Sequence, residues 1–161
     1  MRALRQTYFA CLCWVAVMAL AGPAFPDKAI PYPGTEVRKT AIPFGDLRGR
    51  LEAAIEKYGM FVVTSASASA GAKARGLTIP GNLVLGVFRN DFAVRMLDAS
   101  VPAGIEAPLR FYLTENPDGT ATLTYRTPSA VFAPYGSAAL DTMAVELDAI
   151  WSRIVTDAIG P

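Results

Sequence analysis

Histidine is absent from the 161-residue sequence, and cysteine occurs only twice, as Cys11 and Cys13. Both cysteines fall in an N-terminal segment that we expect to be removed. The remaining chain therefore has no disulfide, no cysteine nucleophile, no Ser-His-Asp triad and no metal site built on histidine or cysteine. We expect neither a metal ion nor a cofactor. An enzyme with this sequence would have to use Asp, Glu, Lys, Ser, Thr or Tyr, and no nucleophile lies at a recognisable spacing from a base.

An excess of charge of either sign is also missing. The chain has 15 Lys and Arg residues against 14 Asp and Glu residues, and removing Arg2 and Arg5 leaves 13 basic residues. A near-neutral protein lacks the basic surface with which nucleic acids are bound. We therefore expect no nucleic-acid partner.

The N-terminus is organised like a secretory signal peptide. Two arginines precede an apolar run at 8–20, and Ala19-Leu20-Ala21 is a small-x-small cleavage site. The run is short for spanning a bilayer. We predict a signal peptide at 1–21 that is cleaved after Ala21, or alternatively after Ala24, and a periplasmic or secreted mature protein. Membrane contact would then be confined to the uncleaved signal; the alternative is that the segment is retained as an anchor.

Behind the signal, residues 22–34 are rich in proline and glycine and are expected to form a linker. A single domain at 35–159 should follow. Without disulfides, an exported domain must be held together by its core.

The clearest structural pattern is a β-hairpin between Ile105 and Pro128. Side chains alternate along a strand, so apolar residues two positions apart share one face. A three-residue loop at 117–119 pairs Leu113 with Leu123 and Phe111 with Tyr125, which places both apolar sets on the same side. The sequence Asn-Pro-Asp-Gly suits a type I turn followed by a left-handed glycine.

The same register places two arginines opposite each other on the other face of the hairpin. Arg110 should lie across from Arg126, with Tyr112 across from Thr124. Like charges directly opposite each other are mildly unfavourable. Either the two side chains splay into water, or a negative group lies between them, in which case the three residues Arg110, Arg126 and Tyr112 form a binding site.

Hydrophobic periodicity predicts the remaining elements. Phe61, Val62 and Val63 are expected to be a buried run, and Ala93, Met96 and Leu97 to face the core. The expected order is strand, helix, strand, short helix, strand, short helix, hairpin, helix, with strands at 35–42, 60–65 and 83–89 and helices at 46–58, 90–99 and 137–159. This order predicts an α+β two-layer sandwich, in which a small, mainly antiparallel sheet has helices packed on one face.

Two polar residues at the starts of short helices have two interpretations each. Ser69, or Ser67, either caps an alanine-rich helix that ends at Gly76 or contributes to an anion site at the start of that helix. Asn90 either caps the helix that follows it or contacts a ligand.

The stretch from Phe44 to Gly136 resembles the bacterial family catalogued as domain of unknown function 302. The resemblance rests on motifs in a fixed order: Tyr58-Gly59, Gly71-Ala-Lys-Ala-Arg-Gly76, Leu85-Gly-Val-Phe88, Asn90, Pro108-Leu109, Asp118-Gly119 and Tyr125-x-x-Pro128. The resemblance implies a compact α+β domain and no assigned activity.

The chain departs from the family pattern at two places. Family members commonly carry a histidine near the position of Ala68, and Phe-Gly-Asn-Pro where this chain has Phe88-Arg89-Asn90-Asp91. Chemistry that depends on that histidine is therefore not expected here.

Three functions remain open. The sequence favours a non-catalytic binding or accessory module of the periplasm or cell envelope, with a small anionic ligand as its partner. The alternatives are a protein that interacts with another envelope component or forms a homodimer, and an enzyme that uses no histidine or cysteine. Phe132 and Tyr135 could line a pocket for such an enzyme, or they could plug the edge of the core.

Overall fold

The computed structural model describes residues 32–160. The predicted signal peptide and most of the predicted linker lie outside them. The strands are β1 (Thr35–Pro43), β2 (Phe61–Ala66), β3 (Asn82–Phe88), β4 (Leu109–Glu115) and β5 (Thr120–Arg126). The helices are α1 (Phe44–Lys57), α2 (Ala68–Lys73), α3 (Asn90–Ala99), α4 (Pro128–Phe132) and α5 (Ala138–Ile159), with 3-10 turns η1 (Val101–Glu106) and η2 (Ala133–Tyr135).

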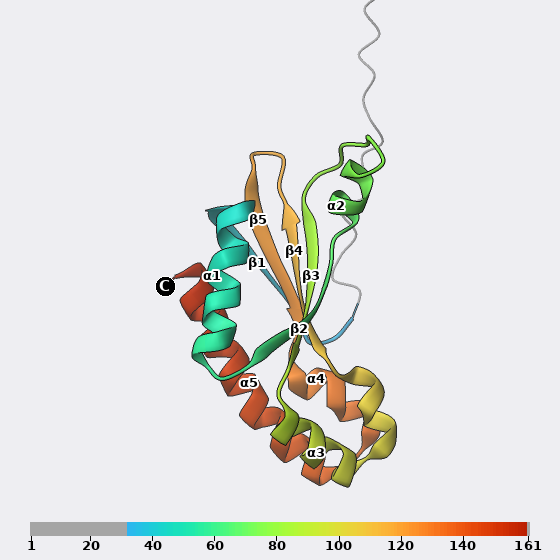
Figure 1. Cartoon of the computed structure of the whole chain (residues 1–161). Coiled ribbons are helices and arrows are strands. Elements are labelled where there is room, and N and C mark those ends of the chain that lie inside the picture. The colour runs from blue at the N-terminus through green and yellow to red at the C-terminus, as the bar shows by residue number, and fades with distance from the viewer. Residues whose placement is uncertain (1–31, 161) are drawn as a thin grey trace, which may run out of the picture.

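The five strands form one antiparallel sheet in the order β1-β5-β4-β3-β2. Helices α1 and α5 lie against one face of this sheet, α3 and α4 gather at one end, and α2 lies at the other end (Figure 1). This arrangement confirms the predicted α+β class. The opposite face of strands β3, β4 and β5 is not covered by α1 or α5 (Figure 1).

The hairpin has the register that the sequence predicts. Leu113 pairs with Leu123, and Phe111 pairs with Tyr125. The turn is closed by the Asn116 N–H, which donates to the Thr120 carbonyl at 2.8 Å, and by the Gly119 N–H, which donates to the Asn116 carbonyl at 2.9 Å. Gly119 has a φ of +81°, the left-handed conformation that glycine adopts without strain.

The core lies between the sheet and the α1–α5 layer. Phe111 stacks on Trp151 of α5 and meets the Tyr125 ring edge-on, with ring centroids 5.4 Å apart in both pairs. Trp151 is 1 % exposed. The predicted apolar stripe of α5 faces this core because residues three and four positions apart share one side of a helix; its buried members are Leu140, Met143, Ala144, Leu147, Trp151, Ile154, Val155 and Ala158.

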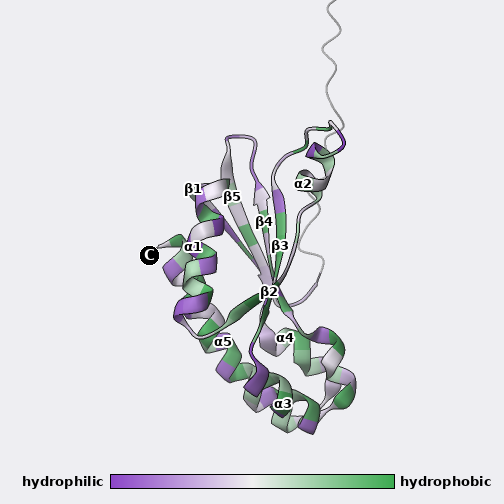
Figure 2. Cartoon of the chain, viewed as in Figure 1, coloured by the Kyte–Doolittle hydropathy of each residue, from purple (hydrophilic) through white to green (hydrophobic). Residues whose placement is uncertain are grey.

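Two predictions of burial are wrong. Phe61 and Val63 are 61 % and 51 % exposed, because β2 is an edge strand that the helix layer does not cover. Figure 2 shows hydrophobic residues along this edge. In α3, Leu97 is 45 % exposed, whereas Phe92, which the pattern assigned no role, is buried beside Met96.

Side chains cap α4 and α5 where the sequence indicates a start. Thr127 accepts a hydrogen bond from the Ala130 N–H at 3.3 Å, and Pro128 occupies the first turn of α4. Ser137 accepts from the Leu140 N–H at 3.4 Å at the start of α5. None of the helices in residues 32–160 has the length and apolar character needed to cross a membrane.

Candidate functional site

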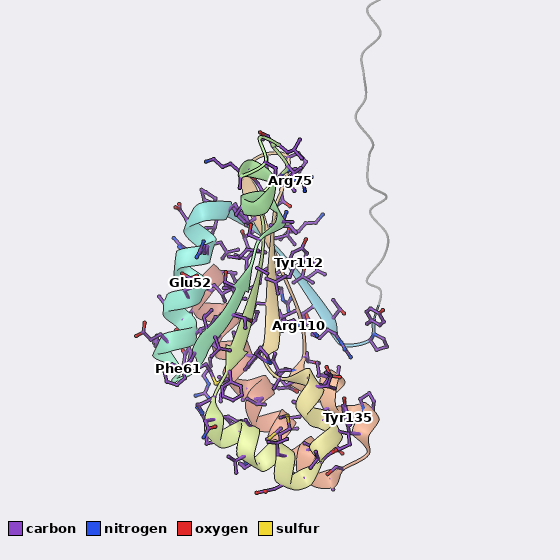
Figure 3. All side chains as sticks on the ribbon, turned by 45° about the vertical axis from the view of Figure 1, so that its right-hand side comes forward. Glu52, Phe61, Arg75, Arg110, Tyr112 and Tyr135 are labelled. Atoms are coloured by element: carbon purple, nitrogen blue, oxygen red, sulfur yellow. The ribbon has the colours of Figure 1, made fainter. Side chains whose placement is uncertain are left out.

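A cavity of about 230 Å³ lies over the sheet face that α1 and α5 leave open. In Figure 3, Arg110 and Tyr112 lie on the side of the sheet away from Glu52 of α1. Strands β1, β3, β4 and β5 form the floor of the cavity, while η1 and α4 contribute residues at one end. Its lining consists of Thr35, Val84, Glu106, Leu109, Arg110, Tyr112, Thr124, Tyr125, Arg126 and Val131.

Strand register brings the two arginines together. Because Phe111 pairs with Tyr125, the next position places Arg110 opposite Arg126. Arg110 pairs on its other side with Gly86, and Arg126 pairs with Thr35. A Cβ on Gly86 would lie 2.8 Å from Pro108 Cγ and would clash with the Thr64 side chain, so only glycine fits beside Arg110.

Arg126 is held in place from the side of α4. Its Nη2 donates a hydrogen bond to the Ala130 carbonyl at 3.0 Å, and the guanidinium carbon lies 5.8 Å from the centre of the Tyr32 ring. Its Nε is buried and has no hydrogen-bond partner in residues 32–160. A buried N–H without a partner costs free energy, which a hydrogen bond from this atom to a ligand oxygen would recover; the Trp151 Nε1 in the core is likewise without a partner in residues 32–160.

Neither guanidinium is neutralised by the described part of the chain. The ion pairs within 4.0 Å in residues 32–160 are Arg38–Glu36, Arg48–Glu52, Lys57–Asp157, Arg89–Asp91 and Arg95–Glu146. Arg110 and Arg126 therefore leave two adjacent positive charges in one cavity. Guanidinium groups match the geometry of carboxylates and phosphates.

Glu106 is the carboxylate in the lining of this cavity. Its Oε1 accepts a hydrogen bond from the Tyr135 hydroxyl at 3.0 Å. Burial and the neighbouring Glu106 carboxylate raise the pKa of Tyr135, so this tyrosine stays protonated and continues to donate at neutral pH. Phe132, the other aromatic of this segment, is 2 % exposed and belongs to the core.

Ser69 and Asn90 do not line this cavity. The Ser69 hydroxyl contacts the backbone of Asn82, accepting from its N–H at 3.2 Å, while Ser67 caps α2 by accepting from the Ala70 N–H at 3.1 Å. Ser69 thus ties α2 to β3.

Asn90 is exposed and is the first residue of α3. The predicted capping role is wrong, because Arg89 occupies the N-cap position with extended backbone and no side-chain cap forms. The Arg89 side chain instead pairs with Asp91 at 2.7 Å and lies over the Phe92 ring.

Several lining residues were not identified from the sequence. Alternation along the strands places Thr35, Val84 and Thr124 on the same face as Arg110, so the pattern could have indicated them once the strand order was known. Glu106 and Val131 carry no such signal, because their positions depend on how η1 and α4 pack against the end of the sheet. Among residues 32–160, no three His, Cys, Asp or Glu side chains converge as metal ligands would.

Comparison with known families gives one match that spans most of the chain. The profile of "Domain of unknown function DUF302" matches residues 36–158. The chain belongs to this family. Its membership confirms the resemblance identified from the motifs.

A solved DUF302 structure has the same fold. It is the crystal structure of an uncharacterized conserved DUF302 protein from Bacillus stearothermophilus, with a TM-score of 0.66 and 17% sequence identity. The alignment covers 79% of this chain and 96% of that chain. At this identity the likeness establishes the fold alone. No curated protein matches the sequence.

Proposed function

We propose that this DUF302 protein is an exported, non-catalytic binding protein that takes a small anionic ligand in the cavity of Arg110, Arg126 and Tyr112. One observation carries the proposal: two guanidinium groups line the same cavity, and neither has a carboxylate within 4.0 Å in residues 32–160. The buried Arg126 Nε adds a hydrogen-bond donor that a ligand oxygen can satisfy.

The rest of the lining suits a ligand that also has an apolar part. Val84 presents aliphatic surface, Leu109 and Val131 add the small part of their side chains that the core leaves exposed, and Tyr112 is 40 % exposed. Arg126 is half-buried, so its attraction for a bound anion is stronger than it would be in open water, whereas Arg110 is exposed. The cavity is therefore suited to a carboxylate or phosphate attached to a small apolar body.

Export is supported by the signal-like N-terminus. N-terminal sequencing of the protein recovered from the periplasmic fraction tests it directly. A chain that begins just after Ala21 supports export, and a chain recovered from the cytoplasm with Arg2 and Arg5 still present contradicts it.

Thermal unfolding with and without ligand tests the binding site. A ligand that binds only the folded state stabilises it, by about 2.7 kcal/mol at roughly 100 times its dissociation constant. We expect isocaproate or inorganic phosphate to raise the melting temperature of the wild type but not of Arg126→Ala. Arg75→Ala is the matched control, since Arg75 lies at the far end of the molecule (Figure 3). No shift with either compound contradicts the proposal.

A second candidate function is self-association through the edge strand β2. All six residues of β2 are exposed and uncharged, and Phe61 is 61 % exposed. Unguarded edges are templates for pairing, and two copies of β2 could pair about a two-fold axis without opposing any charge. Analytical ultracentrifugation tests this candidate. A wild-type dimer that becomes a monomer in Phe61→Lys supports it, and a wild type that is monomeric at all concentrations contradicts it.

A further inference from the structure

We infer that the ligand is a zwitterion of the amino-acid type, whose carboxylate binds Arg110 and Arg126 and whose ammonium group binds Glu106. This inference rests on the proposed function, because it concerns the same cavity. It assigns to Glu106 the role of selecting among the small carboxylates that the arginines attract.

Opposite charges share the cavity without forming an ion pair. Glu106, Arg110 and Arg126 all line a space of about 230 Å³, yet no oxygen of Glu106 lies within 4.0 Å of a guanidinium nitrogen. A flexible glutamate and arginine that are near each other gain energy by forming an ion pair. That gain is small for side chains that reach water, so hydrogen bonds to other groups are enough to keep the two signs of charge apart.

Such hydrogen bonds form on both sides of the cavity. Tyr135 donates to Glu106 Oε1 at 3.0 Å and holds the carboxylate toward η2. Arg126 Nη2 is held at the Ala130 carbonyl of α4, also at 3.0 Å. In Figure 3, Tyr135 lies toward the helical end of the molecule from Arg110. Separate hydrogen bonds thus hold Glu106 and Arg126 on different sides of the cavity, while Arg110 is exposed.

Classes of ligand differ in how well their charges match those of the cavity. A simple anion satisfies the arginines but leaves the Glu106 carboxylate unpaired near the ligand, where like charges repel. A simple cation would pair with Glu106 but would be repelled by the two arginines. A ligand that carries one charge of each sign satisfies both sides, and its side chain can lie against Val84 and Tyr112.

The test compares amino acids with the acids that lack only the amino group. Calorimetric titration of the full mature protein would use L-leucine against isocaproate and L-phenylalanine against hydrocinnamate. A charge-assisted hydrogen bond to Glu106 should make at least one amino acid bind roughly tenfold more tightly than its own partner. Glu106→Gln should remove that preference while leaving the affinity for the partner acid unchanged or higher.

Controls separate this inference from the proposed function. Glu56→Gln, on the exposed side of α1, should behave as the wild type, and the unfolding curve of Glu106→Gln shows whether the variant is folded. If the acids bind through Arg126 but neither amino acid binds more tightly than its partner, the zwitterion inference is wrong and the anion site stands. If neither amino acids nor acids bind, both proposals fail.

Discussion

The indole of Trp151 stacks on the ring of Phe111, with ring centroids 5.4 Å apart and ring planes inclined by 18°. This contact joins α5 to strand β4 of the hairpin. Replacing Phe111 by alanine should lower the free energy of unfolding by about 3–5 kcal/mol, because it removes the ring and leaves a cavity. Urea unfolding followed by Trp151 fluorescence measures the loss.

Tyr112 provides the control for that prediction. It is the next residue of β4 but lies on the open face, 40 % exposed. Tyr112→Ala should therefore cost much less stability than Phe111→Ala, while it affects ligand binding. Equal losses for the two variants would mean that the assignment of the two sheet faces is incorrect.

The hairpin turn gives a second prediction. Gly119→Ala should destabilise the protein by about 1–2 kcal/mol, because an L-residue is strained at the left-handed φ of this position. Gly49→Ala is the matched control: Gly49 lies inside α1, and a Cβ there would meet no atom within 4 Å. That variant should be more stable than the wild type by about 0.5–1 kcal/mol. Chemical unfolding measures the stability of both variants. If Gly119→Ala is as stable as the wild type, residue 119 does not have the left-handed conformation that the turn requires.

Acid stability should depend on Asp157. Its Oδ2 accepts hydrogen bonds from Lys57 Nζ at 2.6 Å and from the Tyr58 hydroxyl at 2.9 Å, which links the end of α1 to α5. Lys57 and Tyr58 lower the pKa of Asp157. A carboxyl with a lowered pKa contributes stability that is present above its unfolded pKa of about 3.9 and is lost as the pH falls through its folded pKa.

Melting temperatures across the acid range test this contribution. Asp157→Asn should lower the melting temperature at neutral pH and lose less stability than the wild type on acidification. Asp98→Asn, at an exposed position of α3 outside the ion pairs of residues 32–160, should keep the wild-type profile. If the melting temperatures of Asp157→Asn and the wild type fall in parallel as the pH is lowered, the ionisation of Asp157 does not contribute to acid stability.

Because β2 is exposed, we expect that its large apolar residue Phe61 can be replaced by a polar one with little loss of stability. Phe61→Thr should change the free energy of unfolding by less than about 0.5 kcal/mol, as most surface substitutions do. Phe132→Thr, at a site that is 2 % exposed, should cost several times more. If both substitutions prove equally damaging under denaturant titration, β2 is covered in solution by something other than the described chain.

The sequence predicts the parts of the fold that depend on residues close together in the chain, such as the hairpin. The register of the hairpin follows from a period of two and a turn that requires glycine, so Phe111 and Tyr125 could be paired from the sequence alone. The exposure of Phe61 could not be predicted, because an apolar run has the same sequence pattern in a covered strand and in an edge strand. Strand order decides that difference, and it is set by contacts distant in sequence.

The candidate site divides in the same way. Arg110, Arg126 and Tyr112 were predicted as neighbours because they lie on one hairpin. Glu106 was missed because its place at the cavity depends on η1 and on the hydrogen bond from Tyr135. For Ser69 the sequence leaves a capping role and an anion site open, and it does not indicate the contact between the Ser69 hydroxyl and the backbone of Asn82, a residue 13 positions away.

Arg110 and Arg126 are proposed to bind the anionic group of a ligand. Arginine side-chain NMR tests this proposal most directly, because the Nε–H of each arginine gives its own resonance and the Arg126 Nε has no partner in residues 32–160. On titration with isocaproate and L-leucine, we predict saturable shifts of the Arg126 and Arg110 resonances, with Arg75 unchanged. Shifts that are absent at both arginines, or equal at Arg75, would show that this pair does not bind the ligand.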